Sequence, residues 1–193
     1  MTDPVRHTSD NLPSVVDRFD DAVDAAWGRA LRGRPAADRI FYLASELGDF
    51  SVIWLLLAGA QGLRSDEEAD ASIRLALLLL GESVLVNQGI KRLVRRPRPD
   101  PVEPRPHHVR RPMTSSFPSG HASSAMAAAG ILSRRHPRRA PLYYALAAIV
   151  ATSRVHVQVH HASDVIAGAA VGATYARLAE RAWPTRAPGT ERP

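Results

Sequence analysis

Two long apolar stretches, residues 40–63 and 72–90, constrain the fold of this chain more than any other feature. Each is close to the length of about 20 residues that a helix needs to cross a lipid bilayer. Each also contains two charged side chains, which are costly in lipid; in chain order they are Glu46, Asp49, Arg74 and Glu82. The two stretches therefore suit either a membrane or the core of a soluble helical bundle.

The segment ahead of these stretches, residues 15–31, has an amphipathic pattern. Its apolar side chains recur at helical spacing. Four aspartates fall on the other side of the same helix, namely Asp17, Asp20, Asp21 and Asp24. The pattern predicts a helix that lies on an apolar surface and turns its acidic side away from it.

Three further helical patterns cover residues 119–133, 141–157 and 163–183. Together with the N-terminal helix and the two apolar stretches, they predict an all-α protein of about six helices. These last three helices are rich in small residues. The pair Gly168 and Gly172, spaced by four, allows two helix backbones to approach each other closely.

The helical patterns define one predicted domain, residues 15–183. Residues 1–14 are polar and lack the apolar run of a signal peptide, so they are predicted to be a disordered leader. Residues 184–193 are predicted to be a disordered tail by composition. A single domain of this size is large enough to bury a core.

The charge balance of the chain is basic, with 25 Lys and Arg against 19 Asp and Glu and a formal net charge of +6. Such a balance suits an anionic partner: nucleic acid, a membrane surface or a phosphorylated small molecule. The chain has no cysteine, which excludes disulfides, thiolate zinc sites and cysteine nucleophiles. Twenty-four of the basic residues are arginine, and Lys91 is the only lysine.

The first candidate functional segment follows the second apolar stretch. Residues 94–118 are rich in proline and arginine and cannot be helical throughout. Because Pro97 and Pro99 stop the preceding helix, Arg98 is predicted to lie on an extended loop. Lys91 projects from the last helical turns, so the two cations can converge on one anion. The same run also suits a solvated basic flank of a membrane helix.

The second segment is Pro-Ser-Gly-His, which leads into an alanine-rich helix. Ser119 is a good helix N-cap, and Gly120 permits a close approach to the backbone. The free amides of the first helical turn form an anion site, with His121 beside it. An ordinary capped helix with a histidine in its first turn has the same pattern.

The third segment contains Ser153, Arg154, His160 and Asp164. If residues 160–164 are helical, the four-residue spacing places the carboxylate and the imidazole on one face, within hydrogen-bond reach. The carboxylate then fixes the tautomer of the ring and leaves the other nitrogen free as a nucleophile or base.

A zinc triad is the alternative interpretation of the third segment. His156, His160 and Asp164 have the residue types and helical spacing of zinc ligands. The neighbouring guanidinium groups would repel a dication, so an anion is the favoured ligand over a metal. A core histidine without function is the remaining interpretation.

Order and spacing of the three segments are more specific than each segment alone. K-x6-R-P, P-S-G-H and S-R-x5-H-x3-D, with every position filled, resemble the signature of the type 2 phosphatidic acid phosphatase family. That family shares a superfamily with vanadium haloperoxidases and bacterial acid phosphatases. The resemblance extends over roughly residues 38–183, with the motifs in 91–164. It implies a helical core, one phosphate pocket, no metal or other cofactor, and a phosphohistidine intermediate.

The resemblance also implies an anion-binding set. Lys91, Arg98 and Arg154 would bind the non-bridging phosphoryl oxygens, helped by the Ser119 hydroxyl and the Gly120 amide. Three cations and a helix N-terminus would supply the charge that a magnesium ion supplies in other phosphoryl transfer enzymes. Lys91, the only lysine of the chain, falls at the position where the signature has lysine.

A catalytic set follows from the same resemblance. His160 would attack phosphorus in line, and Asp164 would orient the ring and stabilise its positive charge. His121 would protonate the leaving group and then deprotonate the water that hydrolyses the phosphoenzyme.

The short chain with its apolar stretches resembles the membrane branch of the family. It implies a multi-pass cell-membrane phosphatase that acts on a lipid phosphate or a polyprenyl pyrophosphate and interacts with membrane lipids. A vanadium-dependent haloperoxidase with the same pocket is one alternative. A non-catalytic basic protein that binds nucleic acid or anionic lipid is another, although it would leave His160 and Asp164 without a role. The basic run has no aromatic side chain for base stacking, so no nucleic-acid partner is expected.

Overall fold

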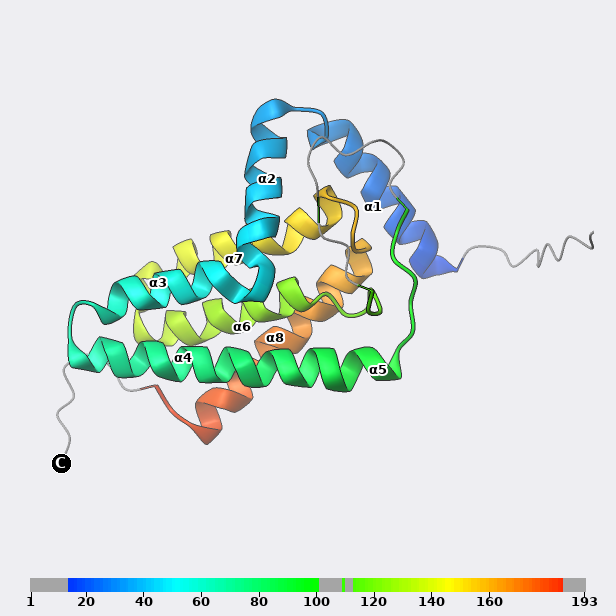
Figure 1. Cartoon of the computed structure of the whole chain (residues 1–193). Helices are drawn as coiled ribbons and strands as arrows, with labels where there is room; N and C mark the ends of the chain where they lie inside the picture. The colour runs from blue at the N-terminus through cyan, green and yellow to red at the C-terminus, as the bar shows by residue number, and fades with distance from the viewer. Residues whose placement is uncertain (1–13, 101–108, 110–112, 186–193) are drawn as a thin grey trace, which may run out of the picture.

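The computed structural model describes residues 14–100, 109 and 113–185, and every regular element within these residues is a helix (Figure 1). The prediction of an all-α protein is therefore confirmed. When the bent run Pro35–Gly62 is counted as one helix, the described part of the chain contains six long helical runs, the number expected from the sequence. The predicted leader and tail fall outside the described residues, apart from the innermost residues of each.

Five helices form a bundle. α6 (Gly120–Arg135) is its central helix and packs against α8 (Ala162–Ala182), α7 (Ala140–His156) and α4 (Asp66–Val84). α3 (Val52–Gly62) packs on the outer side of α4. In Figure 1, α3, α4 and α6 run side by side, and α7 lies behind them. The alanines of α6 are almost all buried, so the core is built from close helix contacts rather than from large side chains.

The contact between α6 and α8 depends on the two glycines that the sequence singled out. A Cβ atom added to Gly168 would lie 2.3 Å from the carbonyl oxygen of Ser119, and one added to Gly172 would lie 2.0 Å from that of Ser123. No side chain fits at either position, so the backbones of α6 and α8 touch. The predicted role of this pair is confirmed, and the contact fixes the start of α6 relative to α8.

α2 (Pro35–Gly48) and α3 together form the helical run expected over the first apolar stretch, but this run is bent and not straight. The chain bends at Asp49–Ser51, where Phe50 and Ser51 have positive φ angles of 52° and 61°. α2 consequently stands at a steep angle to α3 and packs against α7 (Figure 1). The bend brings the polar residues between the two helices to one end of the bundle.

α4 begins earlier than the sequence predicts. The Ser65 hydroxyl caps it by accepting a hydrogen bond of 3.2 Å from the Glu68 amide. Three acidic residues that lie between the two apolar stretches, Asp66, Glu67 and Glu68, therefore form its first turn, where they stabilise the positive end of the helix dipole. α4 continues through a π-helical turn, η2 (Leu85–Ile90), into α5 (Lys91–Leu93), and the helix ends ahead of the prolines as predicted.

α1 (Val15–Leu31) has the predicted bounds and lies across the ends of α7 and α8. Val23 and Trp27 pack against small apolar side chains of the bundle, so the expected apolar contact is confirmed. Asp20 departs from the expected pattern. It is the only buried residue of α1, with 3% of its surface exposed, and does not point away from the protein with the other aspartates. Its burial is explained by polar partners in α8 and in the loop after α5.

Candidate active site

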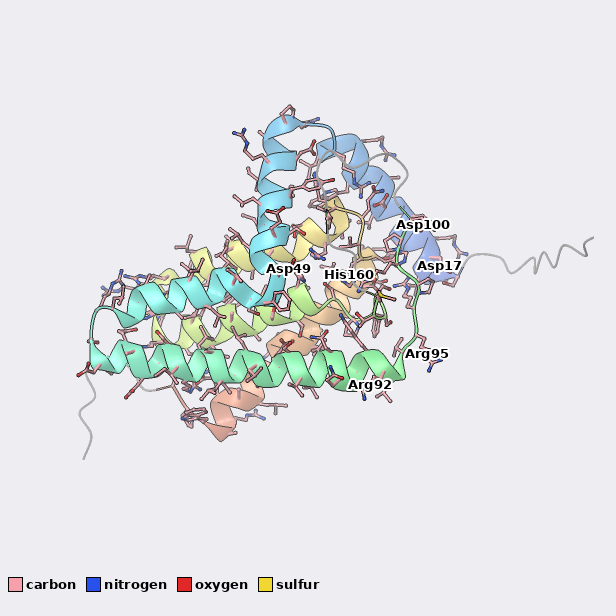
Figure 2. All side chains as sticks on the ribbon, in the orientation of Figure 1. Asp17, Asp49, Arg92, Arg95, Asp100 and His160 are labelled. Atoms are coloured by element: carbon pink, nitrogen blue, oxygen red, sulfur yellow. The ribbon has the colours of Figure 1, made fainter. Side chains whose placement is uncertain are left out.

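A cleft of about 1530 Å³ opens at the end of the bundle where the α2–α3 bend, α5, the start of α6 and the α7–α8 loop meet. Six of the eight site residues named from the sequence line it, namely Lys91, Arg98, Gly120, His121, Arg154 and His160. The other two, Ser119 and Asp164, are fully buried and do not line it. Figure 2 shows Asp49 and His160 at this end of the molecule. The three motifs therefore meet in one place.

The first two motifs are joined by their loops. Described residues 94–100 and 113–119 contain no helix, in keeping with the predicted break. The Arg96 amide donates to the Ser115 hydroxyl at 3.1 Å, and the Ser116 amide donates to the Arg96 carbonyl at 3.0 Å. The Ser116 hydroxyl donates to the Pro97 carbonyl at 2.9 Å. These bonds hold the arginine loop against the segment that starts α6.

Arg98 links this pair of loops to the third motif. Its guanidinium donates to the carbonyls of Val159 at 2.8 Å and Ser115 at 3.2 Å. The same group lies 3.1 Å from Nε2 of His160. Because a guanidinium can only donate, Nε2 must be the acceptor, and the ring proton is therefore on Nδ1. In this tautomer the lone pair that a nucleophile requires is on Nε2, at the cleft, where Arg98 donates to it.

His160 itself lies in the α7–α8 loop and not on the helix that the sequence suggested. α8 begins only at Ala162, and the Arg154 carbonyl accepts the amides of Val159 and His160 at 3.1 and 3.2 Å. Nδ1 of His160 still faces Oδ2 of Asp164, at 3.6 Å, which is longer than a hydrogen bond. Burial lowers the pKa of His160 to about 3, and the nearby guanidinium of Arg154 lowers it too. The ring is thus neutral at pH 7.

Asp164 is held by two donors on its other sides. Arg96 donates to Oδ1 at 2.7 Å, and the His161 amide donates to Oδ2 at 2.9 Å. Burial alone would raise the pKa of Asp164, but the facing His160 ring and these two donors lower it to about 2. Arg96 was missed by the sequence reasoning because it occupies an unspecified position of the first motif. Its only sequence signal is its place beside Pro97 in the arginine run.

Lys91 and Gly120 lie together at the start of α6. Lys91 is 8% exposed, and a Cβ atom added to Gly120 would be 3.7 Å from its Nζ. The ammonium group therefore sits beside the first turn of α6, whose free amides favour an anion. A Cβ atom at position 120 would meet Lys91 and Asn87 at ordinary contact distances, so no clash there requires the glycine.

Arg154 and Ser119 are both tied to the protein framework. Arg154 is 2% exposed, and its guanidinium donates to the Ser45 hydroxyl of α2. The Ser119 hydroxyl caps α6 by accepting the Ala122 amide at 3.4 Å, and the Ser119 amide donates to the Asp164 carbonyl at 3.0 Å. Arg154 lines the cleft, whereas Ser119 stands behind it as the cap of the helix.

His121 has a carboxylate partner that the sequence reasoning did not assign. Its Nε2 lies 3.0 Å from Oδ1 of Asp49 and 3.2 Å from the Ser45 carbonyl. Asp49 belongs to the α2–α3 bend, and both residues line the cleft. Gly48 is required beside them, because a Cβ atom there would be 2.6 Å from the His121 ring. The signal for Asp49 was its charge within an apolar stretch.

His156 lies apart from the cleft. Its Nε2 is 2.9 Å from Oδ1 of Asp38, its Nδ1 accepts the Trp27 indole N–H at 3.1 Å, and its ring stacks on Phe41. These partners come from α1 and α2 and not from the side where His160 faces Asp164. The helical zinc triad considered for this segment is therefore not formed. Nowhere in the described residues do three or more His, Cys, Asp or Glu side chains form a group that could hold a metal.

Two curated relatives match most of this chain. It is 35% identical to "Decaprenylphosphoryl-5-phosphoribose phosphatase" of Mycolicibacterium smegmatis over 159 residues, which cover 80% of this chain and 84% of that protein. The protein of the same name from Mycobacterium tuberculosis, strain H37Rv, is 34% identical over 82% of this chain and 88% of its own length. Both alignments cover well over two thirds of each protein.

Two solved structures share the fold. One is described as the first transmembrane PAP2 type phosphatidylglycerolphosphate phosphatase from Bacillus subtilis, with a TM-score of 0.65 and 24% identity over 86% of this chain and 85% of that one. The other, Aquifex aeolicus LpxE, has a TM-score of 0.66 and 22% identity over 84% of this chain and 95% of that one.

A model of the PAP2 superfamily matches residues 72–188, a range that contains all three motifs. This superfamily includes the type 2 phosphatidic acid phosphatases that the motifs resemble. The family match, the two relatives and the geometry of the cleft agree with one another. The chain is therefore a phosphatase that belongs to the PAP2 superfamily.

Proposed function

We propose that this protein is a multi-pass membrane enzyme that hydrolyses the terminal phosphate of a polyprenyl-linked substrate through a phosphohistidine on His160. The proposal rests mainly on the set of side chains that line one cleft. It holds a neutral, buried imidazole beside the cations Lys91, Arg98 and Arg154, and it also has an apolar wall.

In the first step, the three cations and the amide end of α6 bind the non-bridging oxygens of the phosphate. Nε2 of His160 attacks phosphorus as the bond between phosphorus and the leaving oxygen breaks. The ring gains positive charge, which the Asp164 carboxylate stabilises across the 3.6 Å gap. The bound phosphate anion favours the protonated form of His121, which then donates this proton to the leaving oxygen, so the leaving group departs as a neutral alcohol or an acid phosphate.

In the second step, a water molecule attacks the phosphohistidine. His121, now neutral, accepts a proton from this water as the oxygen bonds to phosphorus. The bond between nitrogen and phosphorus breaks, and its electron pair returns to Nε2 of His160. Inorganic phosphate leaves, and both histidines regain their starting protonation states. Protein cations supply the positive charge in both steps, so the mechanism does not call for a metal ion.

A lipid substrate is supported by the apolar side of the cleft. The wall toward α3 and α4 is made by Phe50, Leu55, Ala76, Leu79 and Leu80. The volume of about 1530 Å³ is larger than most sites for drug-sized ligands and far exceeds that of a phosphate ion. The relatives' name, with its decaprenyl chain and phosphorylated ribose, favours a polyprenyl carrier over a phosphatidyl lipid.

A membrane setting is supported by the outer surface of the bundle. Large apolar side chains are well exposed on several helices, among them Leu56, Leu80, Leu142, Ile166 and Leu178. One helical run in the described residues, Pro35–Gly62, is long and apolar enough by length and composition to span a membrane, and this run bends at Phe50. Multi-pass insertion therefore depends on the bundle as a whole burying its exposed apolar surface in lipid.

The test is a phosphate-release assay on full-length protein purified in detergent, with EDTA present. The panel contains decaprenylphosphoryl-5-phosphoribose, a polyprenyl pyrophosphate, phosphatidic acid and phosphatidylglycerol phosphate. We expect release from a polyprenyl substrate that is unaffected by EDTA. Absence of release from all four compounds would overturn the proposal, and a requirement for added divalent metal would overturn its metal-independent step. Bromide oxidation by vanadate-loaded protein would favour haloperoxidase chemistry instead.

A further inference from the structure

We propose that Asp20 of α1 is a positioning residue for the nucleophile, which it supports through Arg96 and Asp164. The inference rests on the nucleophilic role of His160 in the proposed function. It assigns a part in catalysis to α1, a helix that lies outside the range matched by the family model, residues 72–188.

Asp20 uses both carboxylate oxygens. Oδ2 accepts from Arg96 Nη2 and from the Ser163 hydroxyl, each at 2.7 Å, and Oδ1 accepts from the Ser163 amide at 2.8 Å. The side chain is 2% exposed. A buried carboxylate is costly unless it is paired and hydrogen-bonded, so this arrangement is tolerated only as a complete set.

Arg96 bridges two carboxylates. While Nη2 binds Asp20, Nη1 donates to Oδ1 of Asp164 at 2.7 Å and to the Ser163 hydroxyl at 2.7 Å. The planar guanidinium is thereby fixed at both ends. The orientation of Asp164 is fixed in turn, because Arg96 holds Oδ1 while Oδ2 faces His160.

The charges of Asp20, Arg96 and Asp164 explain why Asp20 matters for the reaction. Arg96 alone would neutralise Asp164 and weaken its attraction for a positive imidazole ring. Asp20 offsets the charge of Arg96, so the three groups together carry one net negative charge beside His160. That charge is the one needed when the ring becomes positive on attack at phosphorus.

α1 also has contacts with the bundle that do not involve Asp20. Val23 and Trp27 provide an apolar contact. Asp21 provides a matched control for charge, because it is the next residue of the same helix and is exposed. Asp17 does not serve this purpose, because it lies 3.8 Å from Arg96 and caps α1 with Ser14.

The experiment compares Asp20→Asn with Asp21→Asn in the full-length protein in detergent, using decaprenylphosphoryl-5-phosphoribose as substrate. We expect Asp20→Asn to lower kcat by about tenfold or more with KM changed less than about twofold, and Asp21→Asn to match the wild type. Inhibition constants for orthovanadate and orthophosphate provide a second readout. Vanadate, which bonds to the histidine, should bind about tenfold more weakly to Asp20→Asn, whereas phosphate binding should be nearly unchanged.

Two further variants separate positioning from helix docking. Val23→Ala loosens α1 without changing charge, so it should lower thermal stability and leave the ratio of vanadate to phosphate inhibition unchanged. If Val23→Ala alters that ratio as much as Asp20→Asn does, the inference is overturned. If Asp20→Asn does not fold, Asp20→Glu decides, because it retains the charge and should keep kcat within about threefold. A folded Asp20→Glu with a tenfold or greater loss would contradict the inference.

The same data distinguish this inference from the proposed function. Wild-type protein that releases no phosphate from the polyprenyl substrate would argue against the function itself. Active wild-type protein with Asp20→Asn equal to Asp21→Asn would leave the function standing and remove only the role of Asp20.

Discussion

The two histidines of the cleft have carboxylate partners in opposite settings. His160 is 3% exposed and faces Asp164, which is fully buried and joined to Arg96 and Asp20. The His121 side chain is 14% exposed, and its partner Asp49 is 35% exposed in the α2–α3 bend. One carboxylate is buried and is fixed by Arg96, which is 19% exposed, and through it by the buried Asp20, whereas the other is partly open to solvent.

This difference matches what each histidine must do. A nucleophile has to meet phosphorus along one line, so a rigid and water-free support is an advantage. An acid that becomes a base in the next step has to exchange protons with the leaving group and with water, so contact with the cleft is an advantage. The family signature names both histidines, but it does not reveal this contrast.

Removal of the nucleophile should have the largest effect on phosphate release and tests the contrast between the two histidines most directly. His160→Ala should lower phosphate release by about a thousandfold or more, because among the described residues the only other imidazole that lines the cleft is His121. Orthophosphate should still bind at the cleft of the variant, which isothermal titration calorimetry measures. Turnover near the wild-type value would show that His160 is not the nucleophile, and the contrast between the roles of His160 and His121 would then fail.

Removal of the acid should have a smaller effect that depends on the leaving group. His121→Ala should lower kcat on the polyprenyl substrate by about 100- to 10,000-fold. With p-nitrophenyl phosphate, whose leaving group needs no proton, the formation of the phosphoenzyme should be much less affected. Rapid-quench measurement of the initial burst of p-nitrophenol checks this. An equal loss of the burst would show that His121 serves binding and not proton transfer.

Neutralising Asp49 tests the open side of the cleft more finely. Asp49→Asn should lower kcat on the polyprenyl substrate by about tenfold, because the His121 ring loses its charged partner at 3.0 Å. The matched control is Glu46→Gln, which removes an exposed charge one turn earlier. Steady-state assays should show the control unchanged. Equal losses in the two variants would point to the overall charge of the bend and not to the contact with His121.

Burial of the His160 ring should also affect how the stability of the protein depends on pH. The pKa of His160 is about 3 in the folded protein, below its ordinary value of 6.5. The neutral ring therefore stabilises the fold above pH 6.5, and this contribution is lost as pH falls from 6.5 toward 3, by up to about 2 kcal/mol at pH 5. Thermal unfolding between pH 7 and 5 should show a shallower decline for His160→Gln than for the wild type. Parallel declines would contradict the expected burial of a neutral ring.

Helix positions and motif residues were largely predictable because their signals are local. Ser14 and Ser119 cap α1 and α6, and apolar periodicity marks the helices that follow them. The signature residues come together because each of them lies at a helix end or in a loop at the same end of the bundle.

The remaining features depend on partners far away in the sequence. Asp20 shares an amphipathic pattern with three exposed or half-buried aspartates, and only Arg96, 76 positions later, explains its burial. The bend at Phe50 depends on positive φ angles in residues that do not favour them, so local propensity argues for a straight helix. The pairing of Asp49 with His121 follows from that bend.

The rod formed by α4, η2 and α5 has a consequence for the choice of fusion sites. Thr185, the last residue of the described range, accepts a hydrogen bond from Arg74 near the start of α4. Lys91, at the other end of the rod, lines the cleft. The helical rise between Arg74 and Lys91 is about 26 Å, close to the thickness of a bilayer core. α1 lies at the cleft end. In the proposed membrane setting, reporters fused ahead of α1 and behind α8 would therefore sit in different compartments, and the first would identify the compartment that receives the released phosphate.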